Sequence, residues 1–435
     1  MSDYYNYQQF TTADLLKEND GMSAGEALKM KLMWDRMRMM PSDIADITGA
    51  TYTYLMNGKH PAGNWTGFFN PGEKVRLRFI NGAAMSYFNV RIPGLEMTVV
   101  AADGQNVQPV DIEEFQIGVA ETYDVIVQPR EDKAYTIMAE SMDRSGFAAG
   151  TLAPRRGMAA EIPPLRKPPR LTMVDMGMDM KMSGMGHVGK PMTQKMESNA
   201  GAAVDHSSMD HAAMGHMNMD HSSMSHDMPA KSGMNKAMSM PAGKGIHDMH
   251  DMHGMTGSTG PIVARHGPDM HGPGNVGVAT VQRNRLGERG TGLENVAHRV
   301  LVYNDLKRLA NDYDNGPISR DIELHLTGNM ERYTWSINGV KYEDADPIRL
   351  KYGERVRFKF VNETMMTHPM HLHGHTFQVV GVNAKRISGA RRDTIYVPPM
   401  AMVTIALDAG EAARWMLHCH HMPHLETGMM TEFAV

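Results

Sequence analysis

The chain has 435 residues and a mass of 48.3 kDa, with 44 basic and 49 acidic side chains and a formal net charge of −5. This length leaves room for two or three domains, and the small acidic excess excludes the net basic face that a nucleic-acid-binding protein would need. The only cysteine is Cys419, which excludes an intrachain disulfide. Its thiol is therefore inert, a nucleophile or a metal ligand.

Two residue types are unusually common: the chain has 44 methionines and 22 histidines. Thioether sulfur and imidazole are ligands that suit copper, so the composition already points toward that metal. No run of about 18 consecutive apolar residues is present, and we expect no membrane span. The N-terminal stretch 1–30 lacks the basic and apolar regions of a secretory leader, so no signal peptide is expected in it.

The first two regions of the chain differ in their residue patterns. Residues 1–46 combine apolar positions with good helix formers and stop near Pro41, which predicts a short helical lead-in. Residues 47–170 consist of short β-rich runs separated by Asn-Gly, Pro-Gly and Asp-Gly turns. This pattern is typical of an antiparallel β-sandwich.

A second β-rich region, residues 276–435, repeats the first at a constant offset. PGEKVRLRFIN (71–81) recurs as YGERVRFKFVN (352–362), and Asn57-Gly58 recurs as Asn338-Gly339, with the same difference in numbering in both cases. An offset held over two separate motifs indicates a duplicated domain. We therefore predict an all-β protein with two Greek-key β-sandwiches.

The segment between the sandwiches, residues 171–275, is of another kind. Its central part, 173–270, contains 21 methionines and no Phe, Tyr or Trp. Without aromatic or β-branched runs it cannot bury enough apolar area to offset its ordering entropy, so we predict disorder. We interpret it as a copper store or delivery tether; the alternative is a flexible linker whose composition has drifted.

Two clusters in the second sandwich carry the chemistry. The first is HPMHLHGH (368–375), and the second is HCHHMPHLETGMM (418–430). In an extended strand neighbouring side chains alternate faces, so Cys419 points one way while the histidines on either side of it point the other way. Cys419 can thus join two metal centres on opposite faces of one strand. The alternative is a histidine-rich loop with surface imidazoles and one buried thiol.

The Cys419 side of this strand has the ligand types of a blue-copper site. His424 and Met429 lie beyond Pro423 and can fold back to join His368, which gives two imidazoles, a thiolate and a weak axial thioether. On the other face, alternation places two imidazoles of the first cluster beside two of the second. These four residues are His371, His373, His418 and His420.

The duplication supplies an internal comparison. Moving the first three histidines of HPMHLHGH back by the repeat offset gives Tyr87, Val90 and Ile92, so the first sandwich carries no ligands at these positions. We expect its role to be structural, or to shape the approach of substrate. His60 is a lone loop histidine there, and we expect it to be solvated.

On these residues the chain resembles the multicopper oxidases, in particular their methionine-rich copper-resistance branch. The spacing His-x-x-His-x-His followed by His-Cys-His-x₃-His-x₄-Met is specific to that family. The resemblance extends from about residue 50 to the C-terminus and implies that both sandwiches are cupredoxin-like. It implies a type 1 copper at His368, Cys419, His424 and Met429.

The resemblance also implies a type 2/type 3 trinuclear copper cluster. Its ligands here would be His371 on the type 2 ion and His373, His418 and His420 on the type 3 pair. A complete member has three cupredoxin domains, and the first brings two more His-x-His pairs. This chain starts where the linker into the second domain would start, so we expect half a cluster, little oxidase activity from the chain alone, and a separate chain as the source of the missing domain.

The activity implied by the resemblance is that of a periplasmic copper-resistance oxidase. Electrons from a reductant such as Cu(I) would pass through Cys419 to His418 and His420, and O₂ would be reduced to water. Copper ions and O₂ are the expected partners, with no nucleic acid and no membrane span. Asp393 matches a position where related cuprous oxidases place an acidic residue near the type 1 site, which suggests a catalytic role.

Several alternatives remain open at this stage. One alternative is that Asp393 is an ion-pair partner of Arg391 or Arg392. Met400 and Met402 are either soft ligands for substrate or core residues. The chain as a whole is alternatively a non-enzymatic periplasmic copper-sequestering protein. A copper nitrite reductase also uses cupredoxin sandwiches, but the paired histidines that flank the cysteine argue against it.

Overall fold

The computed structural model describes residues 11–18, 21–37, 39–44, 46, 49, 52–178, 262–263, 279, 281–282, 285–309, 317–330 and 332–435. Most of the Met/His-rich segment lies outside these residues, and so do the predictions made for it. Within the described part, no helix is both long and apolar enough to cross a membrane.

The predicted helical lead-in is confirmed: its described residues contain two short helices. They are α2 (Thr12–Glu18) and α3 (Ala24–Arg36). Ser23 caps α3 in a reciprocal capping box with Glu26, which satisfies backbone N–H groups at the helix start. Trp34 and Met39 are buried in the core of the second sandwich, so this N-terminal segment is part of the fold of the C-terminal half.

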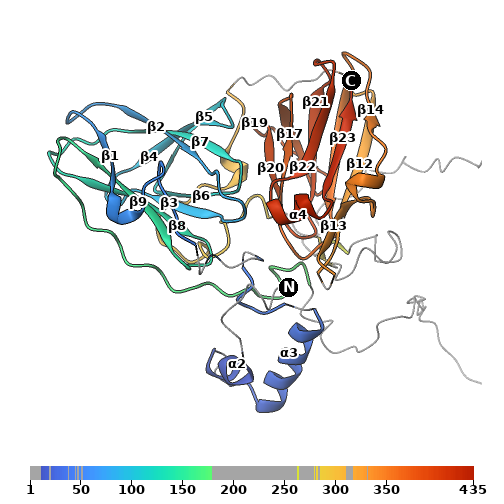
Figure 1. Cartoon of the computed structure of the whole chain (residues 1–435), viewed down its shortest axis with the longest axis horizontal. Helices are drawn as coiled ribbons and strands as arrows, with labels where there is room; N and C mark the ends of the chain where they lie inside the picture. The colour runs from blue at the N-terminus through green and yellow to red at the C-terminus, as the bar shows by residue number, and fades with distance from the viewer. Residues whose placement is uncertain are drawn as a thin grey trace, which may run out of the picture. The chain divides into compact units, whose positions relative to one another are not determined.

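The first sandwich, coloured blue to green in Figure 1, consists of two sheets. One has the order β1-β9-β8-β3-β6 and the other the order β2-β7-β4-β5. The strands are β1 (Trp65–Phe68), β2 (Val75–Ile80), β3 (Phe88–Arg91), β4 (Met97–Ala102), β5 (Gln105–Ile112), β6 (Glu114–Ile117), β7 (Thr122–Val127), β8 (Tyr135–Ser141) and β9 (Phe147–Ala153). A 3₁₀ turn at Pro61–Gly63 precedes β1.

The second sandwich, coloured orange to red, repeats this arrangement. Its sheets have the orders β14-β23-β22-β16-β20 and β13-β12-β15-β21-β17-β18, with β19 paired to β17. The elements are β12 (Arg320–Asn329), β13 (Thr334–Ile337), β14 (Ile348–Arg349), β15 (Arg355–Asn362), β16 (His368–Leu372), β17 (Phe377–Val382), β18 (Lys385–Arg386), β19 (Arg391–Arg392), β20 (Thr394–Val397), β21 (Met402–Asp408), β22 (Arg414–Cys419), α4 (Met422–Glu426) and β23 (Met430–Ala434).

The strand orders agree with the repeat seen in the sequence. The repeated motif forms β2 in one sandwich and β15 in the other. The order β2-β7-β4-β5 in the first sandwich corresponds to β15-β21-β17-β18 within the longer sheet of the second. A parallel pair of strands also recurs, β1 with β9 and β14 with β23. The all-β fold with two sandwiches is thus confirmed. A short antiparallel pair of strands, β10 (Ile262–Val263) with β11 (Val281–Gln282), and 3₁₀ turns at Tyr303–Asp305 and Tyr342–Asp344 complete the described elements.

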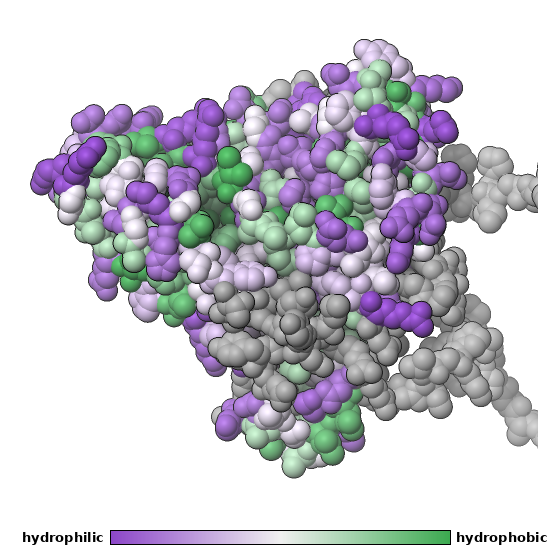
Figure 2. All heavy atoms as spheres, in the orientation of Figure 1, coloured by the Kyte–Doolittle hydropathy of each residue, from purple (hydrophilic) through white to green (hydrophobic). Residues whose placement is uncertain are grey.

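The alternation of apolar and polar residues determines which face of each strand is buried. In β2 the burial alternates strictly, with Val75, Leu77 and Phe79 turned inward and Arg76 and Arg78 exposed. Figure 2 shows the corresponding surface, on which hydrophilic side chains are widespread and hydrophobic ones are scattered among them.

A buried arginine connects the two sandwiches. Arg392 of β19 is 1% exposed, and its guanidinium donates to Asp103 at 2.8 Å and to Glu121 at 3.0 Å, both in the first sandwich. The same group lies over the rings of Tyr123 and Tyr303, with centroid distances of 5.3 and 5.0 Å. Burial raises the pKa of Glu121 to about 7 in spite of the opposing effect of Arg392.

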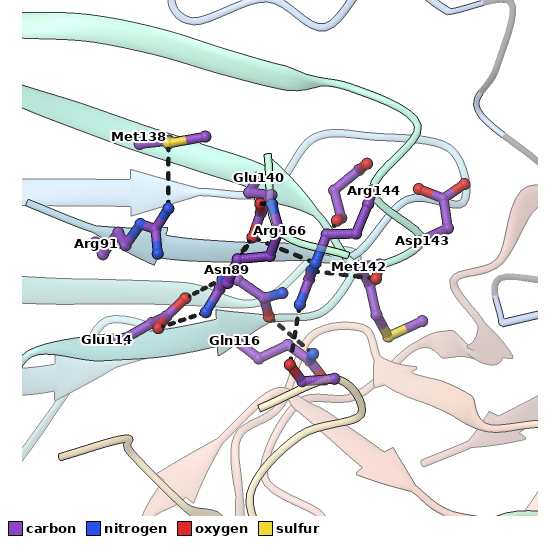
Figure 3. Close-up of polar contacts among 12 residues, drawn as sticks. Asn89, Arg91, Glu114, Gln116, Met138, Glu140, Met142, Asp143, Arg144 and Arg166 are labelled. Atoms are coloured by element: carbon purple, nitrogen blue, oxygen red, sulfur yellow. Dashed lines mark hydrogen bonds and ion pairs between the residues drawn. The ribbon is translucent and has the colours of Figure 1, made fainter. Parts of the chain in front are cut away.

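A second buried network fixes the segment that follows the first sandwich (Figure 3). Arg166 donates to Glu140 at 2.6 Å and to Glu114 at 3.0 Å, and both carboxylates are fully buried. Arg144 donates to the carbonyl oxygen of Gly292 at 3.0 Å. Since β6, β8 and two connecting segments contribute to the network, its ion pairs hold these segments against the sheet.

Candidate metal centre

The two histidine clusters meet on neighbouring strands. β16 and β22 pair antiparallel, with Met370 opposite Cys419 and His371 opposite His418. Residues directly opposite each other point to the same face of a sheet, while neighbours along a strand point to opposite faces. The register therefore separates Cys419 from the imidazoles that flank it in sequence.

On one face, three side chains form a fully buried triangle. The Sγ atom of Cys419 lies 3.6 Å from the Nδ1 atoms of both His368 and His424, and these two Nδ1 atoms are 3.1 Å apart. All three residues are 0% exposed. His368 comes from β16, Cys419 from β22 and His424 from the short helix α4, which follows the N-cap residue His421.

The triangle has the dimensions of a metal site. Donor atoms separated by these distances can each lie about 2.0 to 2.3 Å from one ion, which are typical nitrogen and sulfur bond lengths to a small transition metal. Two imidazoles and one thiolate are the equatorial ligands of a blue-copper centre. The residues present therefore fit copper.

The outer nitrogen of each imidazole is held by a hydrogen bond. His368 Nε2 lies 2.7 Å from the Thr364 hydroxyl, and His424 Nε2 lies 3.1 Å from the Asp46 carboxylate. The Tyr333 hydroxyl donates to the same carboxylate at 2.6 Å. Hydrogen bonds of this kind fix the orientation of a metal-binding histidine and raise its basicity. Both rings are thus oriented with Nδ1 toward Cys419.

Burial also sets the protonation of the triangle. It lowers the pKa of His368 well below the usual histidine value, and it lowers that of His424 although Asp46 opposes the shift. Burial raises the pKa of the Cys419 thiol. The imidazoles are therefore neutral and ready to bind a metal, whereas the thiolate is stable only when a cation is bound.

Met429 is tied to two members of the triangle through its backbone. Its N–H donates to the carbonyl oxygen of His424 at 2.9 Å, and its own carbonyl oxygen accepts from the N–H of Cys419 at 3.0 Å. The side chain is fully buried in the same core cluster as Cys419. Its role as the axial ligand stays a prediction.

On the other face, the four remaining predicted ligands lie together. The Nε2 atoms of His373 and His418 are 3.0 Å apart, and the ring of His371 lies 5.6 Å from the rings of both His418 and His420. His418 Nδ1 is hydrogen-bonded to the Cys419 carbonyl oxygen at 3.0 Å, so its Nε2 is the nitrogen left for a metal. Burial lowers the pKa of His418 to about 4, which keeps this ring neutral.

Asp393, the acidic residue predicted to act near the type 1 site, lies beside His371. It lies 3.6 Å from His371 Nδ1 and accepts a hydrogen bond from Thr394 at 2.8 Å, on the four-histidine face. Burial alone would raise the pKa of Asp393, but these two hydrogen-bonding neighbours lower it below its usual value. Asp393 directly precedes Thr394, which lies opposite His371 in the pairing of β16 with β20, and this register brings its carboxylate to His371. Its catalytic role stays a prediction. Of the two alternative ion-pair partners, Arg392 is bound to Asp103 of the first sandwich, and Arg391 donates a hydrogen bond to Thr376 at 3.1 Å.

The other candidate residues from the sequence lie in the core, at the surface or beside an open cavity. Met400 is 2% exposed and belongs to the core cluster, whereas Met402 is half-buried. His60 is exposed and caps a 3₁₀ turn through Nδ1. His375 lines an open cavity of about 560 Å³ together with His371 and His373.

Three neighbours of the triangle were not found from the sequence. Asp46 was assigned to the lead-in, and neither Thr364 nor Trp335 was considered. The rings of Trp335 and His424 have a centroid distance of 3.9 Å. Asp46 reaches the site from 378 residues away in the chain. The surrounding sequence, PSDIADIT (41–48), contains a second aspartate and two hydroxyl residues, so it holds no signal that singles out Asp46.

Replacing Asp46 by asparagine should weaken copper binding at the triangle by about 10- to 100-fold, because the His424 ring loses its charged anchor. The matched control is Asp35→Asn, which removes an exposed carboxylate of the same N-terminal segment. A competition titration with a Cu(II) chelator, followed by visible absorption, measures the effect. Equal affinities in the two variants would show that Asp46 does not position His424.

The fold and the site define the class of this protein. Residues 2–157 and 315–435 each match the multicopper oxidase family. The chain belongs to this family, is an oxidoreductase, and uses copper as its cofactor.

Several individual proteins are similar to this chain in sequence or in fold. The chain is 44% identical to "Copper resistance protein A" of Escherichia coli over 434 residues, which are 100% of this chain and 67% of the relative. It is 45% identical to the protein of the same name from Pseudomonas syringae pv. tomato, covering 68% of it. Identity to "Multicopper oxidase MmcO" of Mycobacterium tuberculosis is 24%, over 96% of this chain and 55% of that protein. Among solved structures, that of Fet3p, described as a multicopper oxidase that functions in iron import, has 16% identity and a TM-score of 0.48 over 85% of this chain and 57% of that one.

Proposed function

We propose that this chain is a copper-resistance oxidase that converts Cu(I) to Cu(II) and passes the electrons to O₂. The overall reaction is 4 Cu(I) + O₂ + 4 H⁺ → 4 Cu(II) + 2 H₂O, in which four electrons reduce one O₂. The observation that carries the proposal is the buried Cys419–His368–His424 triangle on one face of β22, with four imidazoles on the other. Relatives that the chain resembles over its whole length bear the name copper resistance protein.

The proposed roles of the residues come from the family resemblance, and the positions of the two groups support them. His368, Cys419, His424 and Met429 would hold a type 1 copper, His371 a type 2 copper, and His373, His418 and His420 the type 3 pair. Copper at these positions would supply one-electron redox chemistry. Cys419 is directly bonded through the main chain to His418 and His420, which makes this the shortest covalent connection between the two groups.

The partners and the location are part of the same proposal. Copper ions and O₂ are the reactants, and the periplasm is the compartment. Members of the family use two further His-x-His pairs, and a separate chain carrying a cupredoxin domain is the proposed source of them. The open cavity beside His371 and His373 is the surface where such a domain would complete the cluster.

The second candidate is a copper-sequestering protein without turnover. The chain has 44 methionines and 22 histidines, many more than the two groups of ligands around Cys419 use. This excess of copper-binding side chains favours a sequestering role. Under this alternative the sandwiches are a scaffold.

An anaerobic reduction experiment separates these functions. The full chain, loaded with Cu(II) until it is blue, is mixed with Cu(I), and then O₂ is admitted in the presence of a cupredoxin domain that carries the additional His-x-His pairs. The oxidase proposal expects loss of the blue band on Cu(I) addition and O₂ uptake near one per four Cu(I). A chain that binds Cu(I) while the blue band persists is a sequestering protein.

Replacing Met429 by leucine should raise the reduction potential of the type 1 centre, because the weak axial sulfur ligand that favours Cu(II) is removed. The control is Met416→Leu, an exposed position on β22. A redox titration of the blue band measures both variants. A potential that does not rise in Met429→Leu would count against Met429 as the axial ligand.

A further inference from the structure

Strand β13, which belongs to neither histidine cluster, packs an indole ring against the triangle. Trp335 of β13 is 1% exposed, and its ring forms a tilted stack with that of His424, with a centroid distance of 3.9 Å and an angle of 30° between the ring planes. The same indole meets the His368 ring at 5.2 Å and 70°. One side chain therefore contacts both imidazoles of the triangle.

The indole is held by its ring contacts and not by its polar atom. The Nε1 atom of Trp335 is buried without a hydrogen-bond partner in the described part of the chain. A buried donor without a partner costs free energy, and phenylalanine would fill this position without that cost. The large flat face of the indole is thus the property that this position uses.

The opposite strand is shaped to receive this ring. Gly328 of β12 pairs with Trp335 in the register of β12 with β13. A Cβ atom on Gly328 would lie 2.3 Å from the indole Cε3 atom, which is closer than two non-bonded carbon atoms approach each other. A side chain at this position would therefore force the indole to move, so the glycine keeps the ring where it is.

Tyr333, which directly precedes β13, contacts the same rings. Its ring lies 6.1 Å from that of Trp335 at 88°, and 6.3 Å from that of His424 at 62°. Its backbone has a φ of 50°, a left-handed conformation that is unfavourable for a bulky side chain. Backbone strain of this kind is concentrated at functional sites. The Tyr333 hydroxyl reaches Asp46, the carboxylate bonded to His424, so the strained residue also supports the triangle.

The first sandwich has an aromatic residue at the same position but no copper ligands around it. Moving Trp335 back by the repeat offset gives Tyr54, which is 8% exposed. The Tyr54 hydroxyl is hydrogen-bonded to Ser145 at 3.0 Å, and its ring packs edge-on against Phe88 of β3, at 5.2 Å and 88°. Strand β3 has the place of β16 in its sheet. The aromatic position is thus shared, whereas the stack on an imidazole and the unpartnered polar atom belong to the second sandwich.

We infer that Trp335 is a positioning residue of the copper centre, which restrains the His424 and His368 rings so that their Nδ1 atoms face Cys419 before copper binds; this rests on the type 1 site of the proposed function. The indole Nε1 is a donor only, so Trp335 is no ligand itself and acts through the two histidines. Without the flat ring, the His424 imidazole gains other orientations. Each orientation that turns Nδ1 away from Cys419 lowers the fraction of chains that are ready to bind copper, and the affinity falls by that fraction.

The inference is tested with substitutions in the full chain that leave every ligand in place. Trp335→Leu removes the flat ring and should weaken Cu(II) binding at the triangle by about tenfold, and Gly328→Ala, which forces the indole to move, should weaken it in the same direction. Trp335→Phe keeps a ring at His424 and should stay within about threefold of the wild type. The matched control is Trp415→Leu, because this half-buried indole meets His375 and should leave the affinity unchanged.

Three measurements distinguish positioning from a purely structural role. Competition with a chelator gives the Cu(II) affinity, electron paramagnetic resonance reports the geometry around the bound copper, and urea unfolding of the metal-free chains gives their stability. We expect a changed resonance spectrum in Trp335→Leu and a spectrum like that of the wild type in Trp335→Phe. A Trp335→Leu chain that is less stable but keeps the wild-type affinity and spectrum would overturn the inference.

The outcomes also separate the inference from the proposed function. If the wild-type chain forms a blue copper centre and Trp335→Leu matches it in affinity and spectrum, the inference is wrong and the proposed site stands. If the wild-type chain forms no blue centre, both are wrong. If Trp335→Leu does not fold, Gly328→Ala and Trp335→Phe decide: weaker binding in the first with retained binding in the second supports the inference, and equal affinities in these two variants contradict it.

Discussion

A Cys419→Ser chain should still bind Cu(II) through its histidines but should have no blue colour. The intense visible absorption of a type 1 centre comes from charge transfer between thiolate and copper, and serine offers only a neutral hydroxyl in place of the thiolate. Cys419 is the single cysteine, so no other side chain can replace it. The expected effect is complete loss of the band, because the exchange of sulfur for oxygen removes the soft ligand without changing the shape of the side chain.

Visible absorption and electron paramagnetic resonance of the Cu(II)-loaded variant measure this effect. The matched control is Met416→Leu, earlier on β22 and 38% exposed, which should keep the full band. Circular dichroism establishes that both variants are folded. A Cys419→Ser chain that remains blue would show that the colour has another origin.

Replacing Arg392 by methionine should lower the free energy of unfolding by about 3 to 5 kcal/mol. The change leaves the Asp103 and Glu121 carboxylates, whose side chains are 0% and 2% exposed, without their cation. It also removes a positive charge from between two tyrosine rings. Because Asp103 accepts from the Thr394 N–H at 3.3 Å, and Thr394 is hydrogen-bonded to His371, the loss should also loosen the four-histidine group.

Urea unfolding with a common slope measures the change in stability. Arg391→Met is the control: its side chain is half-buried, makes a hydrogen bond to Thr376, and should cost about 1 kcal/mol or less. Adding Asp103→Asn and Glu121→Gln to Arg392→Met should recover part of the loss, because the buried charges are removed together. A loss below about 1 kcal/mol in Arg392→Met would mean that this ion pair does not hold the sandwiches together.

Local patterns predicted much of the fold. The repeat of PGEKVRLRFIN at a fixed offset indicated two sandwiches, and the structure has matching strand orders in both. Strand alternation around Cys419 predicted two groups on opposite faces, and the register of β16 with β22 agrees with it. These predictions succeeded because they depend on the period of a strand, which a short sequence window contains.

The contacts that sequence reasoning missed are those between distant segments. Asp46 reaches His424 across 378 residues, and Arg392 reaches Asp103 across 289. No local period contains such pairs, since they depend on how the sandwiches and the N-terminal segment pack together. Asp393 illustrates the same limit: its motif was noticed, but its side of the site depends on the pairing of β20 with β16. The burial of His421 is likewise visible only in three dimensions.

The most direct test of the copper centre is X-ray absorption at the copper edge. The full chain is loaded with Cu(II), treated with a chelator that removes weakly bound ions, and measured with about one copper retained. The triangle predicts one short copper–sulfur distance of about 2.2 Å, together with two copper–nitrogen distances of about 2.0 Å. A spectrum that contains only nitrogen and oxygen neighbours would contradict a copper held by Cys419, His368 and His424.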